Sequence, residues 1–303
     1  MKIEKKLWII LFAFGIFAIC FSGWIFRQST AREKLFWDNT IRCETKELKE
    51  GEIKSENIAL PEDFDVPKSI LFKTTHTIAE VWLDGEKIYE YGNEADAPGF
   101  MKTPGSCWHI VDIPGDSSGK NLEVRIIPVY EGYYGNEVSL VYGTRGDCIL
   151  KILTDCLGIL VISCGILFAA VICILLYCGA ARRKRSDKTE AKIEIFLNLG
   201  FFSLLVAVWT LVQCGFLQFL IPDGRTLYFV EYFSLFLFPV PFNFLLYDIC
   251  KSRYHKGALI FSILYLTNME VDVLLQCTGI IDMSRLLSVI HVIMVANVVY
   301  TVV

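Results

Sequence analysis

Residues 149–178 read ILKILTDCLGILVISCGILFAAVICILLYC and contain only two charged side chains, Lys151 and Asp155. About 20 consecutive apolar residues are enough for an α-helix to cross the hydrocarbon core of a bilayer, so this segment predicts a transmembrane helix. Comparable apolar segments occupy residues 7–26, 194–220, 227–249, 258–279 and 286–303, whereas residues 27–148 contain none. The sequence therefore predicts a membrane protein with one helix ahead of a separate domain and five helices after it.

The composition agrees with this layout. The chain is 54% hydrophobic, above the roughly 45–50% that is usual for soluble domains. Its net charge is −4, but residues 27–148 alone carry 14 basic and 22 acidic residues, a net charge of −8. An acidic domain repels phosphates, so we expect no nucleic-acid partner. The lipid bilayer is the partner that the composition predicts.

The basic residues are concentrated in every second connection between the apolar segments. These residues are Lys2, Lys5, Lys6, Arg182, Arg183, Lys184, Arg185, Lys188, Lys192, Lys251, Arg253 and Lys256. The intervening short connections, 221–226 and 279–285, hold one arginine each. Because basic loops stay in the cytoplasm, the N-terminus is expected inside the cell and residues 27–148 outside it. The chain is then a multi-pass plasma-membrane protein.

The first apolar segment, 7–26, has two interpretations. An uncleaved anchor is favoured, because its apolar core is longer than the 7–15 residues of a cleaved signal peptide and no A-x-A site follows it; cleavage stays the alternative. The domains expected are 1–26 as cytoplasmic tip and anchor, 27–148 as extracellular domain and 149–303 as helical domain. The last segment ends at Val303 without a polar flank, so we expect the front part of a longer protein and an incomplete helical bundle.

Residues 27–148 have the pattern of short β-strands. Strand candidates are 70–77, 108–113, 122–129 and 138–142, and residues 80–92 predict a hairpin. Asp84-Gly85 is a favoured pair for its turn, since both central residues of a type I′ turn have positive φ. The strand aromatics Trp82, Tyr89, Trp108 and Tyr142 are expected in the core. The fold class predicted is α+β, with an all-β sandwich or jelly roll outside the membrane and a helical bundle within it.

Cysteine and histidine give no sign of a metal site or catalytic centre. Of 11 cysteines, Cys43, Cys107 and Cys148 fall in the extracellular domain, which allows at most one internal disulfide. His76, His109 and His255 show no ligand spacing and no neighbouring nucleophile pattern. We expect no catalytic residue, no metal and no cofactor within the chain.

Several stretches resemble a known receptor family. In the β domain they are 72–77, 81–92, 104–108 and 141–145, and in the helical domain 199–203, 231–234 and 238–241. They are similar to bacterial seven-transmembrane receptors with diverse intracellular signalling modules, in a branch that usually ends in a GGDEF diguanylate cyclase. The resemblance implies a jelly-roll sensor domain, a cytoplasmic output and a homodimer, because GGDEF domains share an active site. The chain itself holds five of the seven receptor helices and no GGDEF signature.

Aromatic residues in the loops of the β domain are the ligand-binding candidates. Such loops at the end of a rigid sandwich suit stacking on sugar rings or contact with apolar ligands. The candidates are Phe100, Trp108, His109, Tyr130, Tyr133 and Tyr134. The alternative is that these side chains pack in the core or on the outer face of the membrane.

A second set of candidates consists of ionisable residues inside apolar segments, where charge is costly and commonly functional. They are Asp155, Glu231, Glu270, Asp272 and His291, all expected toward the outer leaflet. They could form one polar pocket that links the β domain to helix movement, or they could simply face water near the interface. Pro239 and Pro241 predict a kink that acts either as a hinge or as static shape.

The function expected is that of a bacterial receptor. An extracellular small molecule, with carbohydrate as one candidate class, would bind the β domain and signal through the helices to a cytoplasmic module outside this sequence. A diguanylate cyclase is the favoured output and a histidine kinase the alternative. A transporter or intramembrane enzyme with an accessory domain is the rival class.

Overall fold

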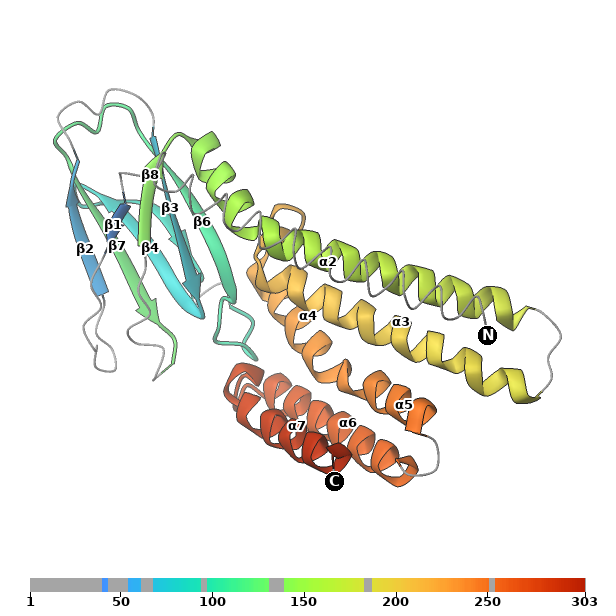
Figure 1. The fold of residues 1–303 in the computed structure, drawn as a ribbon. Helices are drawn as coiled ribbons and strands as arrows, with labels where there is room; N and C mark the ends of the chain where they lie inside the picture. Colours follow the sequence, from blue (N-terminus) through green and yellow to red (C-terminus); the bar gives the residue numbers. More distant parts are fainter. Residues whose placement is uncertain are drawn as a thin grey trace. The chain divides into compact units, whose positions relative to one another are not determined.

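The computed structural model describes residues 40–42, 54–60, 68–93, 97–130, 139–182, 187–250 and 254–302. These residues form two compact units (Figure 1). The β unit comprises the described residues up to 157 together with 215–228, and the helical unit comprises 158–214 and 229–302. The expected anchor at residues 7–26 lies outside the described part of the chain.

The β unit contains eight strands in two antiparallel sheets. The strands are β1 Thr40–Arg42, β2 Lys54–Ala59, β3 Lys68–Thr75, β4 Thr77–Leu83, β5 Glu86–Tyr91, β6 Ser106–Ile113, β7 Asn121–Pro128 and β8 Ser139–Gly143. The first sheet has the order β1-β8-β3-β6 and the second the order β2-β7-β4-β5. The expected strands are confirmed to within a few residues, and β6 is the last strand of the first sheet.

The hairpin between β4 and β5 forms as the sequence predicted. Asp84 and Gly85 have φ values of 47° and 84°, and Leu83 pairs with Glu86 across them. Positive φ at both positions is the geometry of a type I′ turn, whose twist matches that of the flanking strands. A register shift between Val81 and Trp82 marks a bulge in the hairpin.

The core of the β unit lies between the two sheets. Alternate residues of each strand point into it, so Phe72 and Val111 from the first sheet meet Val81 and Val124 from the second. Tyr89 and Tyr142 pack against this core, as expected. Trp82 and Trp108 do not belong to it, and the expectation for both was wrong, because the strand alternation places them on the outer faces of the second and the first sheet.

The helices are α2 Arg145–Ala181, α3 Asp187–Gln213, α4 Gly224–Leu237, α5 Pro239–Cys250, α6 His255–Cys277 and α7 Leu287–Val302, with short 3₁₀ turns η2 Phe216–Phe219 and η4 Met283–Arg285. Within the described residues, four segments are long and apolar enough to cross a membrane: Arg145–Ala181, Ile193–Gln213, Gly224–Ile249 and Lys256–Cys277. The fifth apolar helix, Leu287–Thr301, is shorter. These lengths and compositions are those of a membrane protein.

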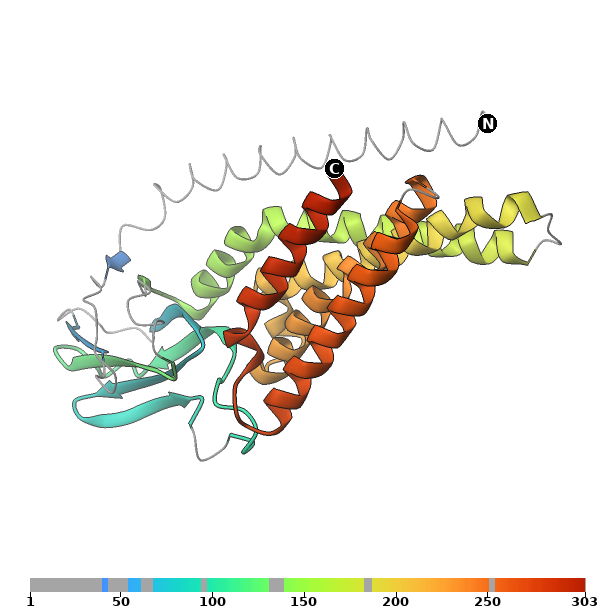
Figure 2. The same ribbon diagram turned by 90° about the horizontal axis from the view of Figure 1, so that it is seen from below.

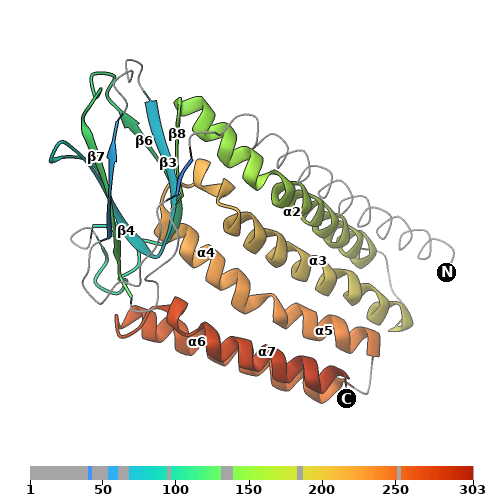
Figure 3. The same ribbon diagram turned by 60° about the vertical axis from the view of Figure 1, so that its left-hand side comes forward.

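Within the helical unit the helices pack side by side. Helix α5 contacts both α3 and α6, and α7 packs on α6 (Figure 3). The connection through η4 turns the chain back, so that α7 runs antiparallel to α6 (Figure 2). Helices α2 and α3 share a hydrogen bond between the hydroxyls of Ser163 and Thr210, 2.7 Å apart.

The third apolar segment after the β domain is divided into two helices. Helix α4 ends at Leu237 and α5 begins at Pro239. Proline has no N–H to donate and its ring clashes with the preceding turn, so Pro239 and Pro241 together account for the division at Phe238. Whether this division moves in function stays a prediction.

Candidate coupling site

The ligand-binding candidates that the structure describes differ widely in exposure. The Phe100 side chain is 39% exposed, whereas His109 is only 1% exposed. Trp108 and Tyr130 are half-buried. Tyr133 and Tyr134 lie outside the described residues. The aromatic loop site expected from the sequence therefore stays a prediction.

His109 lies in the core, where it connects the two sheets. Its Nε2 shares a hydrogen bond with Thr74 Oγ1 of the same sheet (2.7 Å), and its Nδ1 shares one with the hydroxyl of Tyr89 on the facing sheet (2.9 Å). The ring packs 4.8 Å from the ring of Phe72. Burial lowers the pKa of His109 to about 3, so the ring is neutral at physiological pH. Both ring nitrogens are used, which fits a structural role.

Trp108, the neighbour of His109, makes the contact that characterises the site. Its backbone N–H donates to Oε1 of Gln218 (2.7 Å), and Nε2 of Gln218 donates to the Trp108 carbonyl oxygen (2.6 Å). Gln218 lies in η2, 110 residues further along the chain. Because β6 is the last of the described strands in its sheet, the glutamine side chain takes the place of a neighbouring strand. We call this pair of hydrogen bonds the glutamine clamp.

Glycine allows the segment around the clamp to approach β6. Gly215 precedes η2 with a φ of 76°, a conformation that costs other residues about 1–2 kcal/mol. A β-carbon at Gly215 would also lie 2.8 Å from the Trp108 indole nitrogen. A β-carbon at Gly105, which precedes β6, would collide with the backbone of Gly224 at the start of α4. The segment thus fits closely against the strand.

A second contact of this segment lies at the corner between β3 and β4. His76 occupies the corner with a φ of 54°, and its backbone N–H donates to the carbonyl of Gly105 (2.9 Å). Its ring meets the Tyr228 ring edge-on, at 5.8 Å between centroids. Burial lowers the pKa of His76 to about 4. Tyr228 belongs to α4, so the corner contacts the helix directly.

Asp223 fixes the start of α4 beside these contacts. Its carboxylate accepts the backbone N–H groups of Arg225 (3.2 Å) and Thr226 (3.1 Å) and the Thr226 hydroxyl (2.6 Å). This is an N-cap, which satisfies donors that a helix start leaves free. Burial opposes the carboxylate charge, but these hydrogen bonds outweigh it and lower the pKa of Asp223.

The start of α2 is attached to the same sheet. Arg145 Nη1 donates to Oδ2 of Asp112 on β6 (2.5 Å), and the Ser69 hydroxyl on β3 donates to Oδ1 of that carboxylate (2.6 Å). The thiol of Cys148 points at the Ser69 carbonyl, 3.7 Å away. The first sheet therefore holds the starts of two helices, α2 and α4. We define the coupling site as the glutamine clamp, the His76 corner and the Arg145–Asp112 pair.

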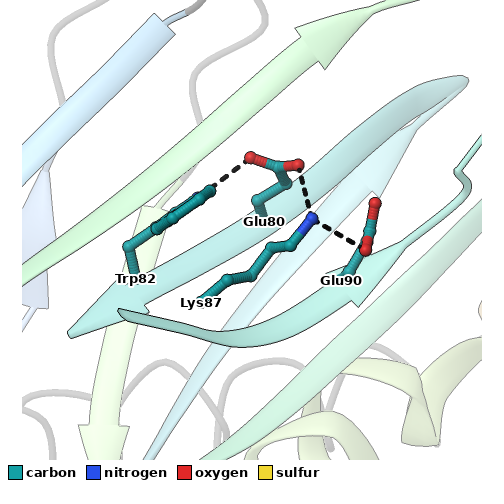
Figure 4. A network of polar contacts seen from close by, with 4 residues as sticks. All are labelled: Glu80, Trp82, Lys87 and Glu90. Carbon is teal, nitrogen blue, oxygen red and sulfur yellow. Dashed lines mark hydrogen bonds and ion pairs between the residues drawn. The ribbon is translucent and has the colours of Figure 1, made fainter. Parts of the chain in front are cut away.

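The outer face of the second sheet carries a separate polar network (Figure 4). The Trp82 indole N–H donates to Glu80 (2.9 Å), and Lys87 pairs with both Glu80 (3.3 Å) and Glu90 (2.8 Å). The guanidinium of Arg125 lies 4.4 Å from the centre of the Trp82 ring. Because the ring is already covered by a cation, we interpret this face as a solvated surface network.

The five ionisable candidates in the helices each have separate surroundings. Asp155 pairs with Lys151 (2.8 Å), Glu231 accepts from Gln213 Nε2 (2.8 Å), and the buried Asp272 accepts from Asn268 Nδ2 (2.8 Å). The exposed residues Glu270 and His291 have no such partner among the described residues. The structure thus pairs Asp155, Glu231 and Asp272 locally, and the role of all five candidates in signalling stays a prediction.

Sequence reasoning missed a neutral polar cluster in the helical unit. Asn297 Nδ2 on α7 donates to Oδ1 of Asn243 on α5 (2.7 Å) and to the hydroxyl of Tyr265 on α6 (3.3 Å). The Tyr254 hydroxyl donates to both asparagines. The only signal available was the presence of asparagines in apolar segments. The cluster joins three helices.

An apolar cavity of about 320 Å³ adjoins this cluster. It lies at the division between α4 and α5 and is lined by Phe202, Phe238, Pro239, Phe242, Tyr265, Met294, Asn297, Val298 and Thr301. Among the described residues, no group of three or more histidine, cysteine or acidic side chains could hold a metal ion. Cys107 and Cys148 are both free thiols.

Comparison with known proteins does not add to this assignment. No protein-family profile, no curated protein and no solved structure matches the chain.

Proposed function

We propose that the protein is a receptor of the bacterial plasma membrane. The β unit faces the outside and binds a small molecule, with carbohydrate as the first class to test. The helices carry the signal to a cytoplasmic output module outside these 303 residues, for which the resemblance favours a diguanylate cyclase and therefore a homodimer. The glutamine clamp is the observation that carries the proposal, because it attaches strand β6 to η2, the turn that leads into α4.

The strand order supports a jelly-roll sensor domain. An eight-stranded jelly roll consists of two four-stranded antiparallel sheets built from two Greek keys. The orders β1-β8-β3-β6 and β2-β7-β4-β5 fit that arrangement. Successive strands change sheet except at the β4–β5 hairpin, so displacing either sheet strains several connections. Such a domain can pass a local change at one edge to the whole unit.

Signalling requires that ligand binding favour one arrangement of the helices. Moving a two-state equilibrium from 1:99 to 99:1 takes about 5.5 kcal/mol of preference for one state. Two attachments to the first sheet are available to carry that preference: Arg145 at the start of α2, and Gln218 in η2, which precedes α4. A ligand that shifts β6 or β3 changes both at once.

Orientation is tested first. We expect the substitution Asp84→Cys, at the exposed β4–β5 turn, to react with a membrane-impermeant maleimide in intact cells. Arg182→Cys, at the other end of α2, is the control and should react only after permeabilisation. Labelling of the two positions in the reverse order would refute the receptor orientation.

Coupling is tested in the full chain in lipid nanodiscs by hydrogen exchange. Gln218→Ala should raise amide exchange both in β6 and in residues 215–228, because it removes both hydrogen bonds of the clamp. Gln213→Ala is the matched control: its amide bonds to Glu231 of the helical unit, so β6 should be unaffected. Unchanged β6 exchange in Gln218→Ala would remove the clamp from the proposal.

A transporter is the second candidate, and the cavity at the helix division is the observation that favours it. Transporters place substrate sites at interrupted helices. The cavity lining is aromatic and aliphatic, so its cargo would be apolar. Accumulation of an apolar dye in proteoliposomes, abolished by Val298→Phe in the cavity lining and not by Val292→Phe on the same helix but outside that lining, would support this candidate over the receptor.

A further inference from the structure

The outer edge of β6 carries backbone groups that no described strand pairs with. In an antiparallel sheet, residues alternate between those that bond to the neighbouring strand and those whose N–H and C=O point away from it. Trp108 directs both groups to Gln218 and so points away from β3. By the same alternation Ile110 also points its N–H and C=O away from β3. Among the described residues, no backbone group outside the sheet forms a hydrogen bond with either of them.

The clamp imitates one residue of a pairing strand. A strand that pairs with β6 would accept from the Trp108 N–H and donate to the Trp108 C=O, as the Gln218 amide does. It would repeat this exchange at Ile110, about 6.8 Å further along the edge. A side chain offers only the first of these two pairs of hydrogen bonds. The backbone of an incoming strand can therefore displace Gln218 and form more hydrogen bonds with β6 than are lost.

Packing of residues 215–218 against β6, the docked state of this segment, also has an unfavourable contribution to its free energy. The Trp108 indole Nε1 is buried and has no hydrogen-bond partner among the described residues. Gly215 lies directly against it, since a β-carbon there would come within 2.8 Å of Nε1. Burying a donor without a partner is unfavourable. Release of the segment would expose this N–H to water, which brings the docked and released states closer in free energy.

We propose that the ligand of the β unit is an extended peptide segment that adds to the edge of β6 and displaces Gln218. Strand addition of this kind obtains affinity from main-chain hydrogen bonds and specificity from alternate side chains. Displacement frees η2 and the start of α4, so binding and signal are one event. The inference rests on the proposed receptor function and replaces the small molecule proposed there with a peptide as the ligand.

The test uses the full chain in nanodiscs and a labelled peptide with the sequence of β3, KSILFKTT, because β3 already pairs with β6 in antiparallel register. Binding is followed by fluorescence anisotropy, with empty nanodiscs as background. A peptide with the same sequence and alternate amides N-methylated is the control, since it cannot form the ladder. We expect the N-methylated peptide to bind at least 10-fold more weakly.

Two variants should change the affinity in opposite directions. Gln218→Ala removes the competitor and should bind the peptide at least 5-fold more tightly. Trp108→Phe removes the unsatisfied N–H, stabilises the docked segment and should bind at least 3-fold more weakly. Peptide addition to the wild type should raise amide exchange in residues 215–228. Equal affinity for both peptides, or for both variants and the wild type, would overturn the proposal.

Failure of this inference is distinguishable from failure of the proposed function. The maleimide and exchange experiments described above contain no peptide. If they succeed and KSILFKTT does not bind Gln218→Ala, strand addition is wrong and the receptor has a ligand of another class. If the peptide binds as expected while Asp84→Cys labels from the cytoplasm, the strand site stands and the receptor orientation falls.

Discussion

The two buried histidines of the β unit predict a steep loss of stability in mild acid. His76 and His109 have side chains that are 5% and 1% exposed. Burial lowers their pKa values from 6.5 to about 4 and about 3. In the unfolded chain both rings bind a proton near pH 6.5, whereas in the folded unit they stay neutral. Between those values the unfolded state holds more protons, so stability falls as pH falls.

The magnitude follows from these pKa values. At each pH, proton binding favours the unfolded state over the folded state by a free energy that depends on the two pKa values of the group. The stability lost on going from pH 7.5 to 5 is the increase in that free energy. With an unfolded pKa of 6.5 this gives about 2 kcal/mol for each histidine, or about 4 kcal/mol for the pair. A domain of about 100 residues has a total stability of about 5–15 kcal/mol. The loss is therefore large enough to unfold or loosen the β unit before the helices change.

The assay is hydrogen exchange of the full chain in nanodiscs at pH 7.5, 6 and 5, corrected for the intrinsic pH dependence of exchange. His109→Gln can keep hydrogen bonds to Thr74 and Tyr89 without a titratable ring, so it should lose only about half as much stability as the wild type. His291→Gln, at an exposed position of α7, is the control. An identical pH dependence in His109→Gln and the wild type would refute the reasoning.

Three further predictions concern other parts of the chain. Asn297→Ala should destabilise the helical unit by about 1–2 kcal/mol in denaturation from mixed micelles, because interhelical hydrogen bonds in membranes average about 0.6 kcal/mol each; the exposed-site control Val299→Ala should differ little from the wild type, and equal effects would contradict the cluster's role. Gly215→Ala should cost more than Gly119→Ala in thermal unfolding, because both positions have positive φ but only the first approaches an indole ring; equal losses would mean that close approach is unimportant. Glu80→Gln should change stability by no more than about 1 kcal/mol in chemical denaturation, since exposed ion pairs contribute little, and a loss above 2 kcal/mol would show that the network stabilises the sheet.

The local elements could be predicted from the sequence because their signals are local. The turn at Asp84-Gly85 depends on two residues that adopt positive φ, and the flanking strands depend on alternation over a few positions. The helix division at Phe238 follows from Pro239 and Pro241 in the same way. Each of these features is decided by residues within one turn of the chain.

The coupling site could not be predicted because its members are distant in the sequence and ordinary in type. Gln218 is a neutral residue near the end of the apolar segment 194–220, and the sequence predicts Trp108 as an aromatic residue of the core. Gly215 ends that helix early and turns the following segment toward β6, a change that depends on contacts about 110 residues away. No periodicity or charge pattern records such a pairing.

The neutral cluster around Asn297 escaped sequence analysis for a related reason. Sequence reasoning gave weight to carboxylates in apolar segments because charge is costly in the membrane. The structure satisfies Glu231 and Asp272 with nearby glutamine and asparagine amides. The contacts that join α5, α6 and α7 come instead from neutral residues around Asn297. Neutral amides satisfy one another at a lower desolvation cost than charges do.

Helix α4 runs from the coupling site to the helix division. Its first residues, from Gly224 to Tyr228, belong to the β unit and its remaining residues to the helical unit. Fourteen residues of α-helix extend about 21 Å and bend little without a break. A displacement of its first turn must therefore be absorbed at its other end, where Phe238 separates it from α5 and borders the cavity. The hydrogen-bonded cluster around Asn297 resists movement of α5 beyond that point. Release of the glutamine clamp should consequently change the volume of the cavity before it changes the packing of α5 against α6 and α7.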